Sequence, residues 1–409
     1  MNRLILIGNG FDLAHGLKSR YKDFIFWYLA DCLSRAGGYP HIYSDEFIDV
    51  YPPSISYVKV ALNIFSDPIV GNTTYEEFIR QHYDRRSLID FLNILPDNNY
   101  LSIPINKNDE YNIYNFRIEI KSTFFGYLIY NCTECGWVDI EQEYFKALKK
   151  YNDKDNAHDL DYIRMINKHF DFLKKKLEEY LTIQDENYDG IFNPNLGKIL
   201  GQEFQEDDFD PSIGDDELRI MLGKDYSVEN NKTQRKVYVL NFNYTNTFYN
   251  YLREIKGNYF TQVEINHIHG QLNNKDNPII FGFGDEHDKD YALFEEQSNN
   301  DLFEHVKSYH YLKTPNYRHL MRFLNEDHFQ VFVLGHSCGL SDRTMFKEIF
   351  DHENCKSVKI LHHKRDDGTT DFFDKTINLG RHFSDKGRMR KLVVNFNEVD
   401  AIPQMKKEI

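Results

Sequence analysis

Short apolar runs that end in glycine or a small polar residue recur along the chain. They cover residues 4–8, 237–243, 263–270, 279–284 and 331–335, with further candidates at 358–363 and 392–396. Runs that are apolar at successive positions are typical of strands covered on both faces, as in a parallel sheet. Helical patterns separate some of them, such as 342–350 after a Ser341 cap. From about residue 235 onward the pattern therefore predicts alternating strands and helices.

The first of these strands lies roughly 230 residues before the next one, which is too far for a single crossover. The segment between them is richer in helical periodicity. Its clearest helix is expected at about 157–183, where Ile163, Ile166 and Phe170 share one face. We therefore predict an α/β fold, with a Rossmann-like parallel sheet formed by residues 1–29 and 235–409. The predicted insertion, residues 30–234, is mainly helical and is a candidate for sensing a trigger or mediating assembly.

Composition restricts the partners and the compartment. A formal net charge of −15 argues against general nucleic-acid binding and against an anionic membrane surface. No apolar run approaches the ~20 residues of a membrane helix, and the apolar start is too short for a signal peptide. Five scattered cysteines predict free thiols in a reducing compartment. We expect a cytoplasmic protein.

A glycine turn, Gly8-Asn9-Gly10-Phe11-Asp12, directly follows the first predicted strand. Two glycines there would let the backbone approach a phosphate, and a following helix N-terminus would add donors. The full G-x-G-x-x-G spacing is absent. A tight strand-to-helix turn without a ligand fits the same residues.

Asparagines and histidines follow two later strands. Period-two alternation would point Asn241 and Asn243 the same way, and would place His267 and His269 on one face. Asn246 fits a turn or a helix cap, and one histidine could equally be a hydrogen-bonded core residue. A histidine can move a proton near neutral pH. The His-x-His pair lacks a third ligand at useful spacing, so we predict no metal site.

The run ending in Gly335-His336-Ser337-Cys338-Gly339 has two functional interpretations. Gly-x-Ser-x-Gly matches the nucleophile elbow of α/β-hydrolases, with Ser337 as nucleophile and Asp366 or Asp371 with His382 as partners. Alternatively, it is a second nucleotide-binding turn. The late start of the next helix, after Ser341 and Asp342, favours the second interpretation.

All four polar segments stand at strand ends in what the pattern predicts to be one parallel sheet. In open α/β sheets those ends converge on the ligand crevice. We therefore expect Asn9, Asn243, His269 and Ser337 to gather around one crevice that binds a nucleotide.

These segments together resemble the AbiH family of bacteriophage abortive-infection proteins, which is in turn distantly similar to sirtuin-like NAD-consuming enzymes. The resemblance covers residues 1–25 and about 236–363. It implies a sirtuin-like core with NAD as substrate and Asn243 and His269 as catalytic residues. It also implies that the two turns bind the dinucleotide, and the candidate binding residues are Gly8, Asn9, Gly10, Phe11, Asp12, His15, Gly335, His336, Ser337 and Asp342.

Three features depart from the sirtuin-like pattern. Asp12 replaces a serine, and Thr245 replaces an aspartate. The two Cys-x-x-Cys pairs of a sirtuin zinc module are also missing, since only Cys132 and Cys135 have that spacing, and this argues against peptide deacetylation. We expect an antiphage protein that hydrolyses NAD to nicotinamide and ADP-ribose, with a phage-derived or host protein as trigger and homo-oligomers as a candidate assembly. The alternatives are a serine hydrolase that uses Ser337 and a non-catalytic nucleotide sensor.

Overall fold

The computed structural model describes residues 1–38, 42–51, 100–102, 117–130, 137–151, 160–222, 235–257 and 259–404. The chain divides into two compact units, one made of residues 1–19 and 181–409 and the other of residues 20–180. The segment predicted as an insertion, 30–234, is therefore shared between them, since its described residues from 181 to 222 belong to the first unit.

A five-stranded, all-parallel sheet forms the centre of the first unit. Its strands are β1 (Asn2–Ile7), β6 (Lys236–Asn241), β7 (Gln262–His267), β8 (Phe329–Leu334) and β9 (Cys355–Leu361), in the order β7-β6-β1-β8-β9. The order reverses between β1 and β8, as in a doubly wound sheet, whose ligands bind beyond the carboxyl ends of the strands at that point. The predicted α/β fold with a Rossmann-like core is confirmed.

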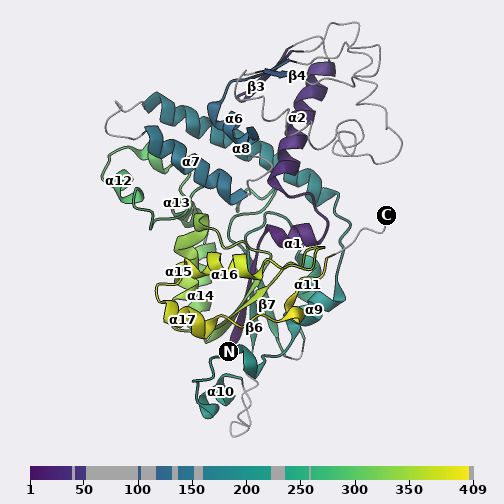
Figure 1. Ribbon diagram of the computed structural model, residues 1–409, viewed down its shortest axis with the longest axis vertical. Coiled ribbons are helices and arrows are strands. Elements are labelled where there is room, and N and C mark those ends of the chain that lie inside the picture. The colour runs from purple at the N-terminus through teal and green to yellow at the C-terminus, as the bar shows by residue number, and fades with distance from the viewer. Residues whose placement is uncertain are drawn as a thin grey trace. The chain divides into compact units, whose positions relative to one another are not determined.

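Alternate residues of each strand pack on opposite faces of this sheet. Leu4 and Leu6 of β1 point to one face, and Ile5 and Ile7 point to the other. The Leu4 face is covered by α14 (Asn316–Glu326), α15 (Arg343–Phe350), α16 (Phe372–Gly380) and α17 (Lys386–Leu392). The Ile5 face is covered by α1 (Asn9–Ala14), α9 (Pro194–Gly201), α10 (Asp215–Met221) and α11 (Tyr249–Ile255). Figure 1 shows α14 to α17 on one side of the strands and α9 and α11 on the other.

Two of the predicted strands are wrong. Residues 279–284 make only an isolated bridge, between Phe283 and Val306, and Val393 makes another with Val358. Ile280 and Phe281 are buried, as residues of a central strand would be. At the two glycines that follow, Gly282 and Gly284, the backbone packs directly against other backbone and forms no ladder. A Cβ on Gly282 would lie 2.0 Å from the carbonyl oxygen of residue 305. Shorter elements complete this unit: α12 (Tyr291–Glu295), α13 (Lys307–His310), η1 (Glu206–Asp208), η2 (Asn300–Phe303), η3 (Tyr311–Lys313), η4 (Leu340–Asp342) and η5 (Glu398–Asp400).

The Ser341 cap is also corrected by the structure. Ser341 lies within η4, one turn before α15, and Asp342 stands at the helix N-cap without a side-chain capping bond. The Asp342 carboxylate instead bonds residues of other segments.

A buried polar network at the amino end of the sheet holds residues 200–208 to the core. Arg3 Nη1 donates to the carbonyls of Leu200 and Gln202, each at 2.8 Å, and its Nη2 donates to Gln330 Oε1. Gln330 in turn donates to Asp208 Oδ2 at 3.0 Å. Burial lowers the pKa of Arg3 to about 9, still above neutral pH, so it stays charged. These contacts explain why this part of the predicted insertion belongs to the first unit.

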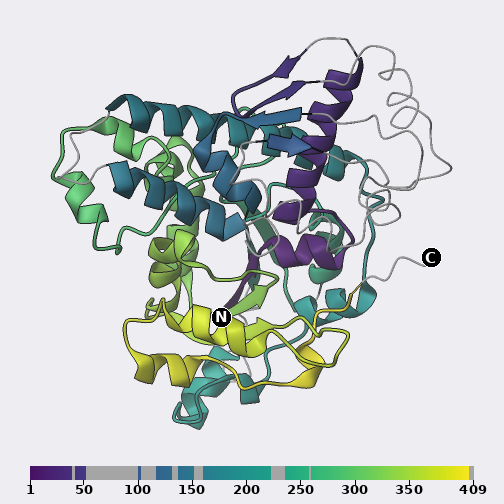
Figure 2. The same cartoon turned by 45° about the horizontal axis from the view of Figure 1, so that its top comes forward.

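The second unit combines helices with a small sheet that the sequence pattern did not predict. Its strands are β2 (Tyr43–Ser44), β3 (Ile48–Tyr51), β4 (Tyr100–Ser102) and β5 (Arg117–Ile120), antiparallel in the order β2-β3-β5-β4. They lie beside α2 (Tyr21–Gly38), as Figures 1 and 2 show. Strands of two to four residues are too short for a period-two signal to stand out.

The other helices among the described residues of this unit are α6 (Thr123–Tyr130), α7 (Trp137–Tyr151) and α8 (Leu160–Glu186), the last of which continues into the first unit. The helix predicted at about 157–183 is α8, and the predicted stripe of Ile163, Ile166 and Phe170 is buried. Among the described cysteines, Cys32, Cys338 and Cys355 are free thiols, while Cys132 and Cys135 lie outside the described residues. None of the helices in the described ranges is long and apolar enough to cross a membrane.

Candidate functional site

The two predicted nucleotide-binding turns lie side by side at the reversal point of the sheet. The Gly8 amide donates to the carbonyl of Leu334 at 3.1 Å, and the Gly10 amide donates to the carbonyl of Gly335 at 2.8 Å. Gly335 has φ of +71°, and a Cβ there would lie 2.2 Å from the Phe11 amide nitrogen. Glycine is thus required for the two turns to pack backbone against backbone.

Three other predicted binding residues of the first turn make contacts within the fold. Asn9 Nδ2 donates to the carbonyl of Ser19 at 2.9 Å, and the Ser19 hydroxyl donates back to the Asn9 side chain. Phe11 is fully buried in the core on the Ile5 face of the sheet. His15 Nδ1 lies 2.8 Å from the carbonyl of Phe11, and its Nε2 lies 2.6 Å from the hydroxyl of Tyr251. These contacts fix α1 against α11.

Asp12 is buried and accepts two hydrogen bonds, from Thr245 Oγ1 at 2.7 Å and from Thr247 Oγ1 at 2.5 Å. Two of the departures from the sirtuin-like pattern, Asp12 and Thr245, are therefore direct partners. Burial raises the pKa of Asp12 to about 6, against the opposing effect of the hydroxyl donors. A carboxylate engaged in this way packs the turn rather than facing a phosphate.

Asn243 and His267 form a polar cluster near the end of β1. Asn243 Nδ2 donates to the carbonyl of Gly8 at 3.1 Å, and its amide donates to Asn241 Oδ1 at 3.0 Å. His267 Nδ1 lies 3.4 Å from both the Asn243 carbonyl and Asn241 Nδ2. Its buried Nε2 has no hydrogen-bond partner within the described part of the chain.

A second cluster joins His269, Asp342, Lys307 and Tyr311. Asp342 Oδ1 lies 3.0 Å from His269 Nε2 and 2.9 Å from Lys307 Nζ, and the Tyr311 hydroxyl lies 3.1 Å from the same histidine nitrogen. The side chains of Asp342 and Lys307 are 4% and 1% exposed. Burying a charged side chain costs free energy unless it is paired. The buried cluster is therefore a stronger functional candidate than a surface ion pair.

The electrostatics of this cluster define its proton state. Burial, and next the charge of Lys307, lower the pKa of His269, so its ring is neutral at pH 7. Burial would raise the pKa of Asp342, but Lys307 and the hydrogen bond from His269 outweigh it and hold that pKa below its usual range. Because an ionised carboxylate only accepts, the proton of His269 is assigned to Nε2, which leaves Nδ1 as the basic nitrogen.

The prediction that His267 and His269 share a face is wrong. The His267 ring stacks against Tyr249 of α11 with centroids 5.8 Å apart, whereas the His269 ring meets the edge of Phe242 at 4.9 Å. Phe242 and Tyr311 both belong to the core on the Leu4 face. Strand β7 ends at His267, so the two-residue alternation stops before His269.

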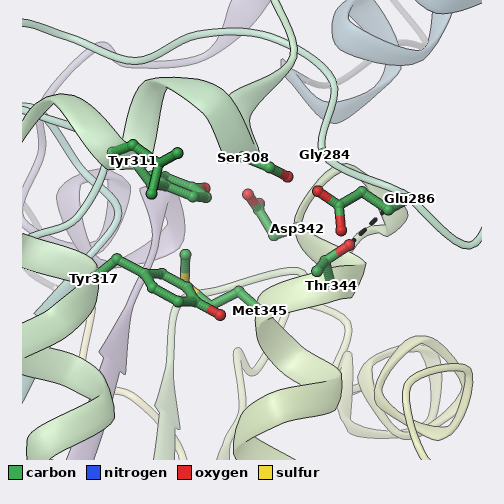
Figure 3. Close-up of a pocket in the computed structure, with 9 residues that line it drawn as sticks. Gly284, Glu286, Ser308, Tyr311, Tyr317, Asp342, Thr344 and Met345 are labelled. Carbon is green, nitrogen blue, oxygen red and sulfur yellow. Dashed lines mark hydrogen bonds between the residues drawn. The ribbon is translucent and has the colours of Figure 1, made fainter. Parts of the chain in front are cut away.

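A cavity of about 160 Å³ adjoins the second cluster. Figure 3 shows Asp342 between the tyrosines and the polar residues of this cavity. Two of its wall residues, Asp342 and Tyr311, are the direct partners of His269. The full lining comprises Gly284, Glu286, Ser308, Tyr311, Leu312, Tyr317, Asp342, Thr344 and Met345.

A family model described as "Bacteriophage abortive infection AbiH" matches residues 4–363. The chain belongs to the AbiH family. No curated protein and no solved structure matches it. The family match spans both strand-end clusters and the whole of the second unit, and it identifies an abortive-infection antiphage protein.

The serine-hydrolase arrangement is not assembled in this AbiH protein. His382 lies near the Gly-x-Ser-x-Gly turn, but its Nε2 bonds the carbonyl of Cys338 at 2.8 Å. Asp371 pairs with Lys375 at 3.1 Å. Ser337 is exposed and its carbonyl accepts from Asn378, and no hydrogen bond among the described residues joins its hydroxyl to a histidine.

His336, the middle residue of that turn, is buried and packs on Phe242 with ring centroids 4.4 Å apart. Its Nδ1 accepts from the Cys338 amide at 2.9 Å. Burial lowers the pKa of His336 to about 3, so it stays neutral. His336 thus supports the turn from inside the core.

Sequence reasoning missed two residues of the AbiH cluster, Lys307 and Tyr311. Both stand in short helical segments, α13 and η3, between β7 and β8, a region that carried no motif. The only signal was the polar and aromatic run Lys307-Ser308-Tyr309-His310-Tyr311, which reads equally well as a surface loop. A lysine that is 1% exposed is rare and cannot be recognised from its neighbours in sequence.

Proposed function

We propose that this AbiH protein acts in phage defence by hydrolysing NAD at the bond between nicotinamide and ribose, giving nicotinamide and ADP-ribose. The observation that carries the proposal is the buried pair of His269 and Asp342 at the carboxyl edge of a doubly wound sheet, beside a cavity. Buried ionisable groups with shifted pKa values cluster at functional sites. The similarity of the strand-end segments to sirtuin-like enzymes supports NAD as the substrate.

The reaction breaks one carbon–nitrogen bond and adds one water. Both electrons of the bond between ribose C1′ and the ring nitrogen leave with nicotinamide, so the pyridinium becomes a neutral ring. The ribose passes through an oxocarbenium-like state, as in other glycoside hydrolyses. A water oxygen then bonds C1′, and its proton goes to a base.

His269 is the proposed base. It is neutral at pH 7 because burial lowers its pKa, and its Nδ1 is available to accept a proton. Asp342 would orient the ring and stabilise the imidazolium that forms, in the manner of the carboxylate in a catalytic triad. Lys307 keeps Asp342 ionised and thereby sets the tautomer of His269.

Asn243 is proposed to position the ribose or the water. Its amide hydrogens are directed to the carbonyl of Gly8 and toward Asp12, which leaves Oδ1 to accept from a hydroxyl. Phe242, the residue before it, contacts the His269 ring, so the backbone of one segment supports both groups. Such positioning raises the rate by fixing reactants in the productive geometry.

The test measures NAD in cells and with purified protein. Cells expressing the wild type or a variant are infected with phage, and NAD and nicotinamide are quantified over time, because a trigger could be needed. His269→Gln should lower NAD loss by about 10²–10⁴-fold. His319→Gln, an exposed histidine on α14, is the matched control and should leave it unchanged.

Two outcomes contradict the proposal. NAD loss that persists in His269→Gln would reject the site. Protection against phage without NAD loss, combined with saturable NAD binding by the purified protein, would favour a non-catalytic nucleotide sensor.

A further inference from the structure

The cavity beside Asp342 has room for one ring and no more. Its volume is about 160 Å³. An engineered protein cavity of roughly 150 Å³ binds benzene, whereas whole drug-sized ligands need roughly 300–1,000 Å³. A dinucleotide could therefore place only one of its rings here, and the rest would lie outside.

One wall of the cavity is aromatic. The rings of Tyr311 and Tyr317 are nearly parallel, at 12°, with centroids 5.9 Å apart, and Met345 lies next to them. In Figure 3 both tyrosines lie on one side of the cavity, and the oxygens of Asp342, Ser308 and Glu286 lie across from them. An aromatic face favours a flat ring and attracts a positive charge.

The polar side-chain atoms of the lining residues are oxygens, apart from the sulfur of Met345. Asp342 and Glu286 contribute carboxylates, and Ser308 and Thr344 contribute hydroxyls. None of the nine lining residues is a lysine, arginine or histidine. Lys307 balances Asp342 from outside the lining, so the exposed Glu286 leaves the cavity with a net negative charge. A phosphate or carboxylate would be repelled, and a cation would be attracted.

We propose that this cavity binds a single planar, positively charged nitrogen heterocycle, and that phosphate or carboxylate groups are excluded from it. The link to catalysis rests on the proposed function, because nicotinamide, the ring that is cleaved from NAD, is the one that carries the positive charge. Cleavage removes that charge, so the neutral product is held less tightly than the substrate ring. The same lining that selects the substrate would thus release the product.

The experiment compares three probes of nearly equal shape on the full-length protein. 1-Methylnicotinamide is a cation, nicotinamide is neutral and nicotinate is an anion, and their dissociation constants are measured by NMR titration at constant ionic strength. We expect the cation to bind about tenfold more tightly than the neutral ring, with the anion weakest. Glu286→Gln should remove most of this preference, whereas Glu353→Gln, an exposed glutamate outside the lining, should keep it.

A second pair of variants tests the aromatic wall. Tyr317→Leu should weaken binding of the cation several-fold, and Tyr317→Phe should retain it, since only the ring face is needed. The inference is overturned if nicotinate binds as tightly as 1-methylnicotinamide, if no probe binds, or if Glu286→Gln leaves the preference intact. The probe affinities are measured without turnover. They therefore test this inference independently of whether the protein hydrolyses NAD.

Discussion

Two regions at the carboxyl edge of the parallel sheet differ in what surrounds their polar groups. The closed region comprises the turns at residues 8–12 and 335–337 with Thr245 and Thr247, where backbone meets backbone and Asp12 is saturated by hydroxyl donors. The open region comprises His269, Asp342, Lys307 and Tyr311 beside the cavity. The glycine motifs that most resemble a nucleotide site lie in the closed region. A glycine pattern therefore indicates that another group approaches the backbone closely. Only the tertiary structure shows whether that group is a ligand or another turn.

The two regions should respond differently to substitution. Changes to the buried groups of the closed region should cost stability, because those groups are part of the packing, whereas the exposed side chain of Ser337 should tolerate substitution. Changes around the cavity should alter proton state and ligand binding as well. Four substitutions test this division.

The largest effect is expected from Gly335→Ala in the closed region. The substitution combines a φ of +71° with a Cβ 2.2 Å from the Phe11 amide nitrogen, so the two turns must separate. We expect the free energy of unfolding to fall by more than about 4 kcal/mol. Gly368→Ala is the control, because its φ is +83° but nothing lies within 4 Å of the added Cβ, and strain alone costs roughly 1–2 kcal/mol. Equal losses in urea denaturation would contradict the packing of the two turns.

The second largest effect is expected from Lys307→Met, which tests whether Lys307 stabilises the buried Asp342 in the open region. Removing the cation leaves Asp342 buried without a charged partner, held by His269 and by a long hydrogen bond from Ser341, which should cost about 3 kcal/mol. The low pKa of Asp342 stabilises the wild type above the unfolded pKa, and that stability is lost as pH falls through the folded pKa. Without Lys307 the loss should begin at higher pH. Lys236→Met, whose pairs with Glu264 and Glu326 lie at the surface, should cost at most about 1 kcal/mol.

Asp12→Asn should change how stability depends on pH. The pKa of Asp12 is raised to about 6, so its contribution to stability is fully present below about pH 4 and is lost as pH rises through 6. The wild type should therefore lose on the order of 2 kcal/mol at this site between pH 4 and 7. The asparagine variant should lack that loss, and Asp276→Asn, at an exposed position, should retain it. Identical pH profiles of melting temperature for Asp12→Asn and wild type would show that Asp12 is not held as described.

The smallest effect is expected from Ser337→Ala. The serine side chain is exposed and bonds no histidine within the described residues. NAD loss, phage protection and melting temperature should stay within error of the wild type, and a fluorophosphonate probe should label neither protein. Loss of activity in this variant would return the serine-hydrolase alternative to consideration.

Much of the fold could be predicted because its signal is local. The five core strands were found from apolar runs, since a strand covered on both faces needs apolar side chains at successive positions. The two strand predictions that failed, at 279–284 and 392–396, show the limit of that signal. Apolar residues in loops, such as those at 279–281 and those at 392–394 around the end of α17, form the same kind of run without a ladder.

The candidate site was predicted only in part. Asn243 and His269 were found because they closely follow strand ends, where polar residues are conspicuous, and Asp342 was found as part of the polar segment between β8 and α15. Lys307 and Tyr311 were missed because their role comes from burial against Asp342 and His269. A sequence pattern gives no measure of burial for a lysine in a short helix.

The sequence by itself determined the type of sheet, the places where its strands end and the family to which the chain belongs. These follow from residue spacing, since alternation and turn glycines act on near neighbours. The tertiary structure alone decided that the two glycine turns close on each other and that His269 meets Asp342, 73 positions further along the chain. Those contacts depend on how strands and helices pack, and packing brings together residues whose spacing in the sequence carries no information about their distance in space.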